Sequence, residues 1–512
     1  MHAPSERAGF GRLLSGLGVA AASVVLGVVV LRLASAQTRW IVFGTGAVVL
    51  ALVTMLWGVR RSLTVYTLMA LTIDAHYYVT LPPPPLNTGV TSLGAITIPL
   101  ALVPGGLLLA MQLMVNRADG TRFDWGQDVG WAVLWVMLTG AFSMILSSTR
   151  FTGICVLWQG LALYALFLVV LNAVRTREEA HRLIPLLQVA LLGQLLVFLL
   201  QLVTGVKFNA VGRVEAVAGE GASLLHHATG TAAVTTAGFA TFLEPLILVC
   251  YVAYRAWAPG RSRNLAGLLF ALGAVVVALT LNRSSWIGFP LGLVAAEVVM
   301  RRRGLVTAVP GANRRLVAGM AAVVVVFAMT FPLFQSARNA KHEEDAQQRF
   351  DLMKPAMNMI THNPIIGVGP GAYAYKLREY AGGYQGWLYI VHNDYLLIWA
   401  ERGIVGFIAW LALIRAFGRT MSRASKVKDT KMACLAVGAL AGLVVHLWEI
   451  FWTSFMAFPT YGVIYVLTAA CAVALRLERE TGAHGSEDAS ARPAPADPWV
   501  PASGMAAVAG RS

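Results

Sequence analysis

Apolar runs long enough to cross a lipid bilayer dominate this sequence. A helical span needs roughly 20 apolar residues. We place 14 such runs near residues 13–34, 40–58, 62–80, 92–115, 128–147, 152–174, 183–204, 232–254, 264–281, 286–300, 315–334, 394–416, 431–453 and 460–476. Charged residues make up only 13% of the 512, against about 25% in soluble proteins. The pattern predicts an all-α polytopic membrane protein with about 12–14 transmembrane helices, and it excludes a soluble globule or a disordered chain.

The basic residues predict the orientation in the membrane. The formal net charge is +15, which in a soluble protein would indicate a nucleic-acid partner. Here most Lys and Arg residues fall in alternate loops, such as Arg60–Arg61, Arg175–Arg182 and Arg301–Arg303. Cytoplasmic loops carry this excess, so we expect both termini in the cytoplasm and no nucleic acid. The four cysteines lie inside apolar runs without metal-ligand spacing, and no metal or cofactor is expected.

Two predicted outer segments are too long to be simple turns, 205–231 and 335–393. The second contains Phe350 and Trp387, with helical apolar spacing over 346–360, which indicates an ordered subdomain. We therefore divide the chain into N-terminal transmembrane helices (1–180), central transmembrane helices (181–334), a periplasmic loop subdomain (335–393), C-terminal transmembrane helices (394–477) and a disordered cytoplasmic tail (478–512).

The stretch from His392 to Gly406 is the most informative part of the sequence. His392 lies where an apolar helix starts, and an imidazole can serve as a base near neutral pH. Glu401 follows within the same helix, and Gly403 and Gly406 allow close packing. The structural alternative is that His392, Asn393 and Asp394 only cap the helix, because Asn and Asp are good caps.

Further candidates precede that stretch. Arg349 opens an outer helix, and Asn363-Pro364 and Gly367-x-Gly369-Pro370-Gly371 form a turn-rich loop. No strand precedes these glycines, so they are not a nucleotide-phosphate loop. Arg283 joins two apolar runs beside Trp286; it is either functional or a residue that extends to the membrane interface.

Ionisable residues inside the predicted spans need partners. Glu244 precedes Pro245 in one span, with Arg213 upstream. His446 and Glu449 share a helix face, for which a structural ion pair or hydrogen bond is the simplest role.

These stretches resemble the O-antigen ligase and O-antigen polymerase superfamily of bacterial envelopes. Asn282 to Trp286 is similar to its Ser-Arg-x-Trp motif, Arg349 to Gly371 to its Arg…Asn-Pro-x-x-Gly-x-Gly loop, and His392 to Gly406 to its His-Asn…Glu-x-Gly signature. The resemblance covers roughly residues 180–475. It departs at 227–236, where the family's Arg and Asn-Pro-Asn are missing.

The resemblance implies a GT-C-like, metal-independent, inverting glycosyltransferase of the bacterial inner membrane. It would move a glycan from undecaprenyl diphosphate to an acceptor sugar hydroxyl at the outer face, without a cofactor. His392 would be the base, Arg283 and Arg349 would stabilise the diphosphate, and Glu401 would orient the site. Arg213, Asn393, Asn363 and Gly369 are the predicted substrate-binding residues.

Several functions remain open. We favour an exopolysaccharide or O-antigen polymerase over a ligase that uses lipid A–core or a related enzyme that uses a protein serine as acceptor. A chain-length regulator or a flippase is a further partner that the family suggests. A transporter or flippase would show inverted repeats, and we find none. A non-catalytic scaffold would tolerate the loss of both His392 and Arg349.

Overall fold

The computed structural model describes residue 56 and residues 58–80, 95–204, 228–306, 339–382, 390–453 and 458–490, apart from residues 75, 119, 234 and 281. Within these ranges eight helices are long and apolar enough to cross a membrane. They are α5 (Gln127–Leu146), α6 (Arg150–Ala173), α7 (Arg177–Thr204), α8 (Thr236–Ala256), α9 (Arg261–Leu279), α14 (Asp394–Ala424), α15 (Thr430–Trp452) and α16 (Phe458–Ser490). The prediction of a helical multi-pass membrane protein is confirmed.

Five more helices complete the described helical part: α3 (Val59–Leu71), α4 (Leu102–Ala118), α10 (Arg283–Arg302), α12 (Asn339–His362) and α13 (Tyr373–Tyr380). α10 covers the span that we predicted over 286–300. The spans predicted over 13–34 and 315–334, and nearly all of 40–58, lie outside the described residues.

Two of the predicted spans are wrong over part of their length. Where we expected continuous helices over 62–80 and 92–115, β1 (His76–Thr80) pairs antiparallel with β2 (Ala95–Pro99). The strands are rich in β-branched and aromatic residues, which favour a strand. Four consecutive prolines separate them in the sequence, and proline cannot continue a helix. Mean hydropathy alone does not distinguish such a strand from a helical segment.

The core of the bundle is α8, packed against α15 and α10. α8 is buried along nearly its whole length. Gly438 and Gly442 of α15 lie directly against Val249 and Pro245 of α8, so that an added Cβ would overlap them. Small residues at such contacts allow two helix backbones to approach closely within a membrane.

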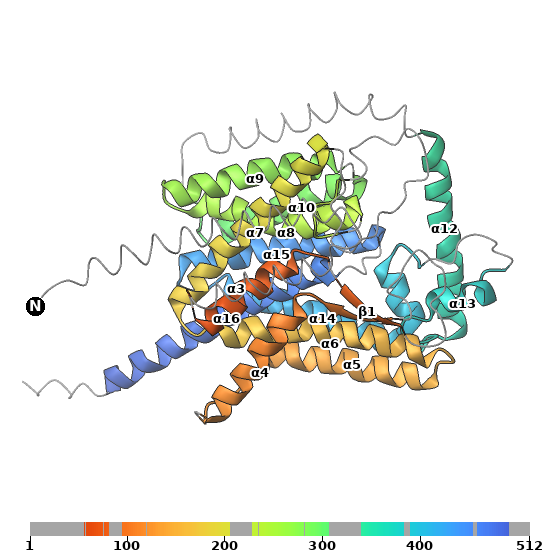
Figure 1. Ribbon diagram of the computed structural model, residues 1–512, viewed down its shortest axis with the longest axis horizontal. Coiled ribbons are helices and arrows are strands. Elements are labelled where there is room, and N and C mark those ends of the chain that lie inside the picture. Colours follow the sequence, from red (N-terminus) through yellow and green to blue (C-terminus); the bar gives the residue numbers. More distant parts are fainter. Residues whose placement is uncertain are drawn as a thin grey trace, which may run out of the picture.

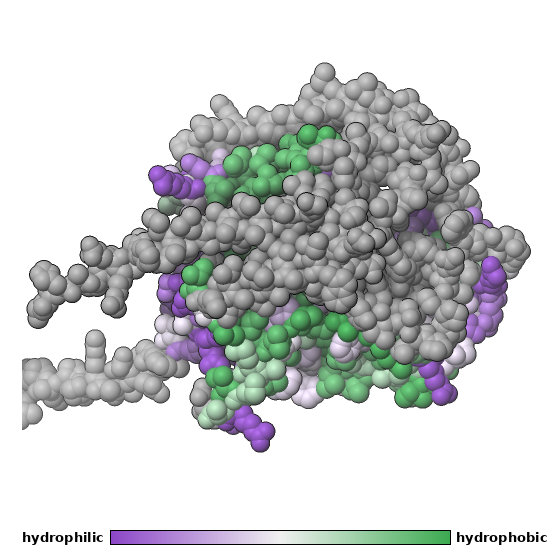
Figure 2. All heavy atoms as spheres, viewed as in Figure 1, coloured by the Kyte–Doolittle hydropathy of each residue, from purple (hydrophilic) through white to green (hydrophobic). Residues whose placement is uncertain are grey.

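The helices around this core expose apolar side chains outward. Figure 2 shows hydrophobic side chains along the flank of the bundle, with hydrophilic groups at its ends. The exposed large hydrophobic residues include Trp131, Trp135 and Phe142 of α5 and Leu268 and Val275 of α9. Such a surface fits a lipid environment better than water.

α12 and α13 lie at one end of the bundle, away from the end where α16 leaves it (Figure 1). They have a hydrophobic cluster of their own. It includes Leu352, Met359, Tyr373 and Leu377, and it extends to Leu397 at the start of α14. The loop unit is therefore packed onto the first turns of α14.

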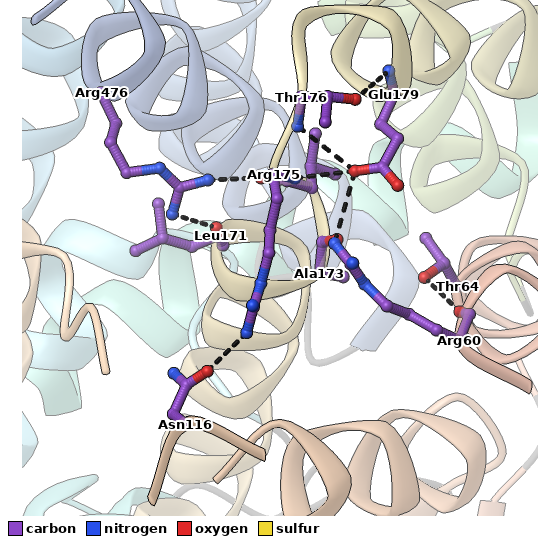
Figure 3. Close-up of polar contacts among 10 residues, drawn as sticks. Arg60, Thr64, Asn116, Leu171, Ala173, Arg175, Thr176, Glu179 and Arg476 are labelled. Atoms are coloured by element: carbon purple, nitrogen blue, oxygen red, sulfur yellow. Dashed lines mark hydrogen bonds and ion pairs between the residues drawn. The ribbon is translucent and has the colours of Figure 1, made fainter. Parts of the chain in front are cut away.

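Arginines cover the C-terminal end of α6 (Figure 3). Arg476 donates to the Leu171 carbonyl at 2.8 Å, and Arg60 donates to that of Ala173. The last carbonyls of a helix have no partner within the helix, and cations are favoured beside them. At the same end Asp429 caps α15 and lies 2.6 Å from His181 Nε2.

α16 continues to Ser490, past residue 478, where we expected the disordered tail to begin. Residues 475–481 lack glycine and proline, and Arg476 pairs with Glu480 one turn further along. Good helix formers and such pairs prolong a helix beyond its apolar part.

Candidate functional site

The centre of the candidate site is a break in α14. Gly403 has φ 63° and ψ −173°, a backbone conformation that is essentially restricted to glycine. The break leaves backbone groups on both sides of Gly403 without their usual helical partners. Non-helical backbone at membrane depth is tolerated only where protein satisfies such groups.

The glycine-rich loop satisfies them. Val368 N donates to the Ala400 carbonyl at 2.9 Å and Gly369 N to the Glu401 carbonyl at 2.8 Å. In the opposite direction, Ile404 N donates to the Pro364 carbonyl at 2.8 Å and Val405 N to the Ile365 carbonyl at 3.4 Å. The two segments predicted from the sequence as separate motifs are thus paired through their backbones.

Positive φ angles let the loop come this close. Gly367 has φ +77° and Gly369 has φ +113°. A Cβ on Gly367 would overlap the Glu401 backbone, and one on Gly369 would overlap the Ser147 side chain. The structure therefore places Gly369, a predicted substrate-binding residue, at a position where only glycine fits.

The Glu401 side chain also binds this loop. It is buried at 4% exposure, and its Oε1 accepts a hydrogen bond from Tyr373 N at 3.2 Å. Tyr373 is the first residue of α13 and donates its hydroxyl to the Leu352 carbonyl of α12. Glu401 thus connects α14 to α13 directly, and to α12 through Tyr373.

Three hydroxyls that sequence reasoning missed hold the other side of the loop. Ser143 Oγ donates to the Ile366 carbonyl at 2.7 Å, Ser147 Oγ to that of Val368 at 2.8 Å and Thr152 Oγ1 to that of Pro370 at 3.1 Å. They come from the end of α5 and the start of α6. The available signal was two serines four residues apart, on one helix face, at the end of an apolar run.

His392 lies just before α14, half-buried. Asn393 is the N-cap, and its side chain accepts a hydrogen bond from Leu396 N at 3.0 Å. Asp394 accepts one from the Tyr461 hydroxyl of α16, and Tyr395 donates its hydroxyl to the Leu447 carbonyl of α15 at 3.0 Å. Asn393 therefore caps α14, as the structural alternative predicted. Hydrogen bonds of Asp394 and Tyr395 hold the turn that carries His392 against α16 and α15.

The Arg283 motif is anchored by Glu449. Asn282 Nδ2 and Ser284 Oγ, on either side of Arg283, donate to Glu449 Oε2 at 3.2 and 2.5 Å. The Arg283 side chain itself is exposed at the start of α10. Glu449 bonds to α10 through these groups, and the His446 ring packs edge-on against Tyr461 at 5.0 Å. The described contacts of His446 and Glu449 are with these other residues, and no described hydrogen bond or ion pair joins the two directly, although we had expected one.

The remaining predicted residues are spread more widely. Arg349 is exposed on α12. Asn363 Nδ2 donates to the Tyr380 hydroxyl at 2.9 Å, which ties the loop to α13. Arg213 lies outside the described residues. Among the described contacts, Glu401 and Gly369 are brought together, and none joins Arg283 to Arg349.

Comparison with known protein families gives a match to the O-antigen ligase family. The match covers residues 268–411, from within α9 to within α14. The O-antigen ligase match contains Arg283, Arg349, the loop 363–371 and the break at Gly403, but not Arg213, Glu244 or Glu449. It confirms the resemblance drawn from the motifs.

Two further comparisons give weaker likenesses. An uncharacterized protein of Haemophilus influenzae is 21% identical over 230 residues, which are 40% of this chain and 56% of that protein. The chain thus spans little more than half the length of this curated relative. A chain of a solved peptidoglycan synthase complex, described as coordinating polymerization and crosslinking, shares 16% identity with a TM-score of 0.39, over 70% of this chain and 98% of that one.

Proposed function

We propose that this protein transfers a glycan from undecaprenyl diphosphate to an acceptor sugar hydroxyl at the outer face of the bacterial inner membrane. The observation that carries the proposal is the pairing of the loop 364–369 with residues 400–405 across the break in α14. This pairing joins the two most specific family motifs into one unit, and the O-antigen ligase match contains both.

The proposed chemistry needs a base and positive charge. His392 would take the proton of the acceptor hydroxyl, since an unperturbed imidazole titrates close to neutral pH. Arg283 and Arg349 would stabilise the diphosphate leaving group, because a guanidinium forms bidentate bonds with phosphate oxygens. Their exposed side chains are compatible with binding a substrate from outside the protein. Inversion at the sugar carbon and independence from metal belong to this proposal.

Glu401 would act through the loop, since its carboxylate binds Tyr373 N. Arg213, Asn393, Asn363 and Gly369 remain the proposed substrate-binding residues. The side chains of Asn363 and Asn393 also shape the loop and the start of α14. We also propose that both termini are cytoplasmic, which would put α12 and α13 on the outer side.

Within this class we favour an exopolysaccharide or O-antigen polymerase over a ligase. A deletion strain tests the choice when lipopolysaccharide and secreted polysaccharide are run side by side on a gel. Single repeats without long polymer indicate a polymerase. Full-length polymer on its lipid carrier, with bare lipid A–core, indicates a ligase. Unchanged polymer and unchanged lipopolysaccharide would contradict the proposal.

A further inference from the structure

Glu244 of α8 and Glu449 of α15 are buried carboxylates that have no role in the proposed transfer reaction. Each has an exposure of 0%. Thr241, one turn before Glu244, donates to Glu449 Oε2 at 3.5 Å. Pro245, next to Glu244, packs against Gly442 of α15. The two carboxylates therefore lie between the same pair of helices. Two ionised carboxylates in one buried site repel each other, and a buried charge without a partner is costly. One of the two charges therefore has to be neutralised.

Hydrogen-bond donors are divided unevenly between the two glutamates. Glu449 Oε2 accepts from Ser284 Oγ, from Asn282 Nδ2 and, at 3.5 Å, from Thr241 Oγ1. Both oxygens of Glu244, and Oε1 of Glu449, have no hydrogen-bond partner among the described residues. Donors stabilise the ionised form of a carboxyl group. Glu449 is thus the better place for the negative charge, and Glu244 the better place for a proton.

We propose that Glu244 and Glu449 form a proton-binding site that holds one proton, carried by Glu244, at neutral pH. A protonated Glu244 supplies an O–H donor, and Glu449 Oε1 is an acceptor without another partner in the described part of the chain. Gly288 leaves room at this oxygen, since a Cβ there would lie 3.1 Å from it. The site is inferred from the burial of both carboxylates and from the packing of α8 against α15, so it does not depend on the transferase proposal.

The proton site lies directly under the Arg283 motif. α10 contributes Asn282, Ser284 and Ser285 to it, and the exposed Arg283 is the charged group of that helix end. On α15 the buried His446 is one turn from Glu449 and packs against Tyr461, which in turn donates to Asp394. Loss of the proton would put a second negative charge beneath the start of α10. The occupancy of the site is therefore coupled to the placement of Arg283.

Infrared difference spectroscopy of the full-length protein in lipid nanodiscs tests the assignment. The wild type is expected to show the carbonyl band of a protonated carboxyl group at neutral pH, and Glu244→Gln is expected to lose it. Glu297→Gln is the matched control, because Glu297 pairs with Arg255 at 2.8 Å and should not contribute to the band. The buried Glu401 could contribute to the same band, so Glu401→Gln measures its share. Absence of the band from the wild type, or a band of unchanged intensity in Glu244→Gln, overturns the proposal.

Thermal unfolding gives a second test. Gln resembles a protonated Glu, so Glu244→Gln should keep the wild-type midpoint at neutral pH, whereas Glu449→Gln should lower it. The wild-type midpoint should fall as the pH rises, because the folded protein would hold a proton that the unfolded chain releases. If NaCl raises the midpoint above that in choline chloride, and Glu244→Gln removes this difference, the site binds Na⁺ and the proton assignment is wrong. Should Glu244→Gln not fold, loss of the wild-type band at alkaline pH still tests the assignment.

Discussion

Gly403→Ala should disrupt the site from its centre. The backbone conformation at Gly403 costs a residue with a side chain about 1–3 kcal/mol. The new Cβ would overlap the Ile365 carbonyl group, and overpacking of this kind costs typically about 1–3 kcal/mol. The two effects together give a destabilisation of about 2–6 kcal/mol. Moving the loop away to relieve the overlap would break the backbone bonds to Pro364 and Ile365.

The assay compares thermal unfolding in detergent with glycan transfer in cells. Gly193→Ala is the matched control, because Gly193 lies in the apolar helix α7 with nothing within 4 Å of an added Cβ. Alanine is a better helix former than glycine, so the control should keep its stability and activity. We expect Gly403→Ala to insert into the membrane, to unfold at a lower temperature and to lose transfer. Wild-type stability and activity in Gly403→Ala would refute the role assigned to the break.

Three further substitutions test other parts of the site. Arg283→Lys should abolish transfer in a complemented deletion strain, because an ammonium lacks the planar fork of a guanidinium. The control Arg301→Lys, at the other end of α10, should remain active. Full activity of Arg283→Lys would show that Arg283 does not bind the leaving group. Asn393→Ala should lower the free energy of unfolding by about 1 kcal/mol, because the helix cap is lost, whereas Asn393→Asp should keep the cap. If both variants lose transfer but keep the wild-type unfolding midpoint, Asn393 contacts the substrate instead. Burial opposes ionisation of Asp429, but hydrogen bonds from His181 and from Met432 N outweigh it and hold the pKa of Asp429 below its usual range. Such a carboxylate stabilises the fold above the unfolded-state pKa and loses that effect as the pH falls through the folded-state value. Unfolding midpoints should therefore separate Asp429→Asn from the wild type at neutral pH and converge in acid; a constant difference would contradict this reasoning.

The sequence predicted the helices of the bundle well, because an apolar run of about 20 residues has few alternatives to a membrane helix. The boundaries of α5, α6 and α8 lie within a few residues of the predicted spans. The prediction was wrong at 76–80 and 95–99, where two apolar strands pair with each other. Strand pairing depends on a distant partner segment, and hydropathy does not identify that partner.

The candidate site was predictable in its residue types but not in its contacts. The glycines of the loop and Gly403 indicated close approach, yet the pairing of 364–369 with 400–405 is made by backbone groups that every residue carries. Glu244 was expected to need a partner, but which residues lie near its carboxylate depends on how α8 and α15 pack. Packing between distant helices leaves little trace in a single sequence.

Purified protein in liposomes containing an undecaprenyl-diphosphate-linked repeat tests the central claim most directly. We predict that the wild type releases undecaprenyl diphosphate as it joins the glycan to an acceptor, and that His392→Ala inserts normally but does neither. The His392→Gln variant serves as a second, more conservative substitution and should also be inactive, since an amide cannot take the proton. Full transfer by His392→Ala, or no release of undecaprenyl diphosphate by the wild type with any sugar acceptor, would contradict the proposed function.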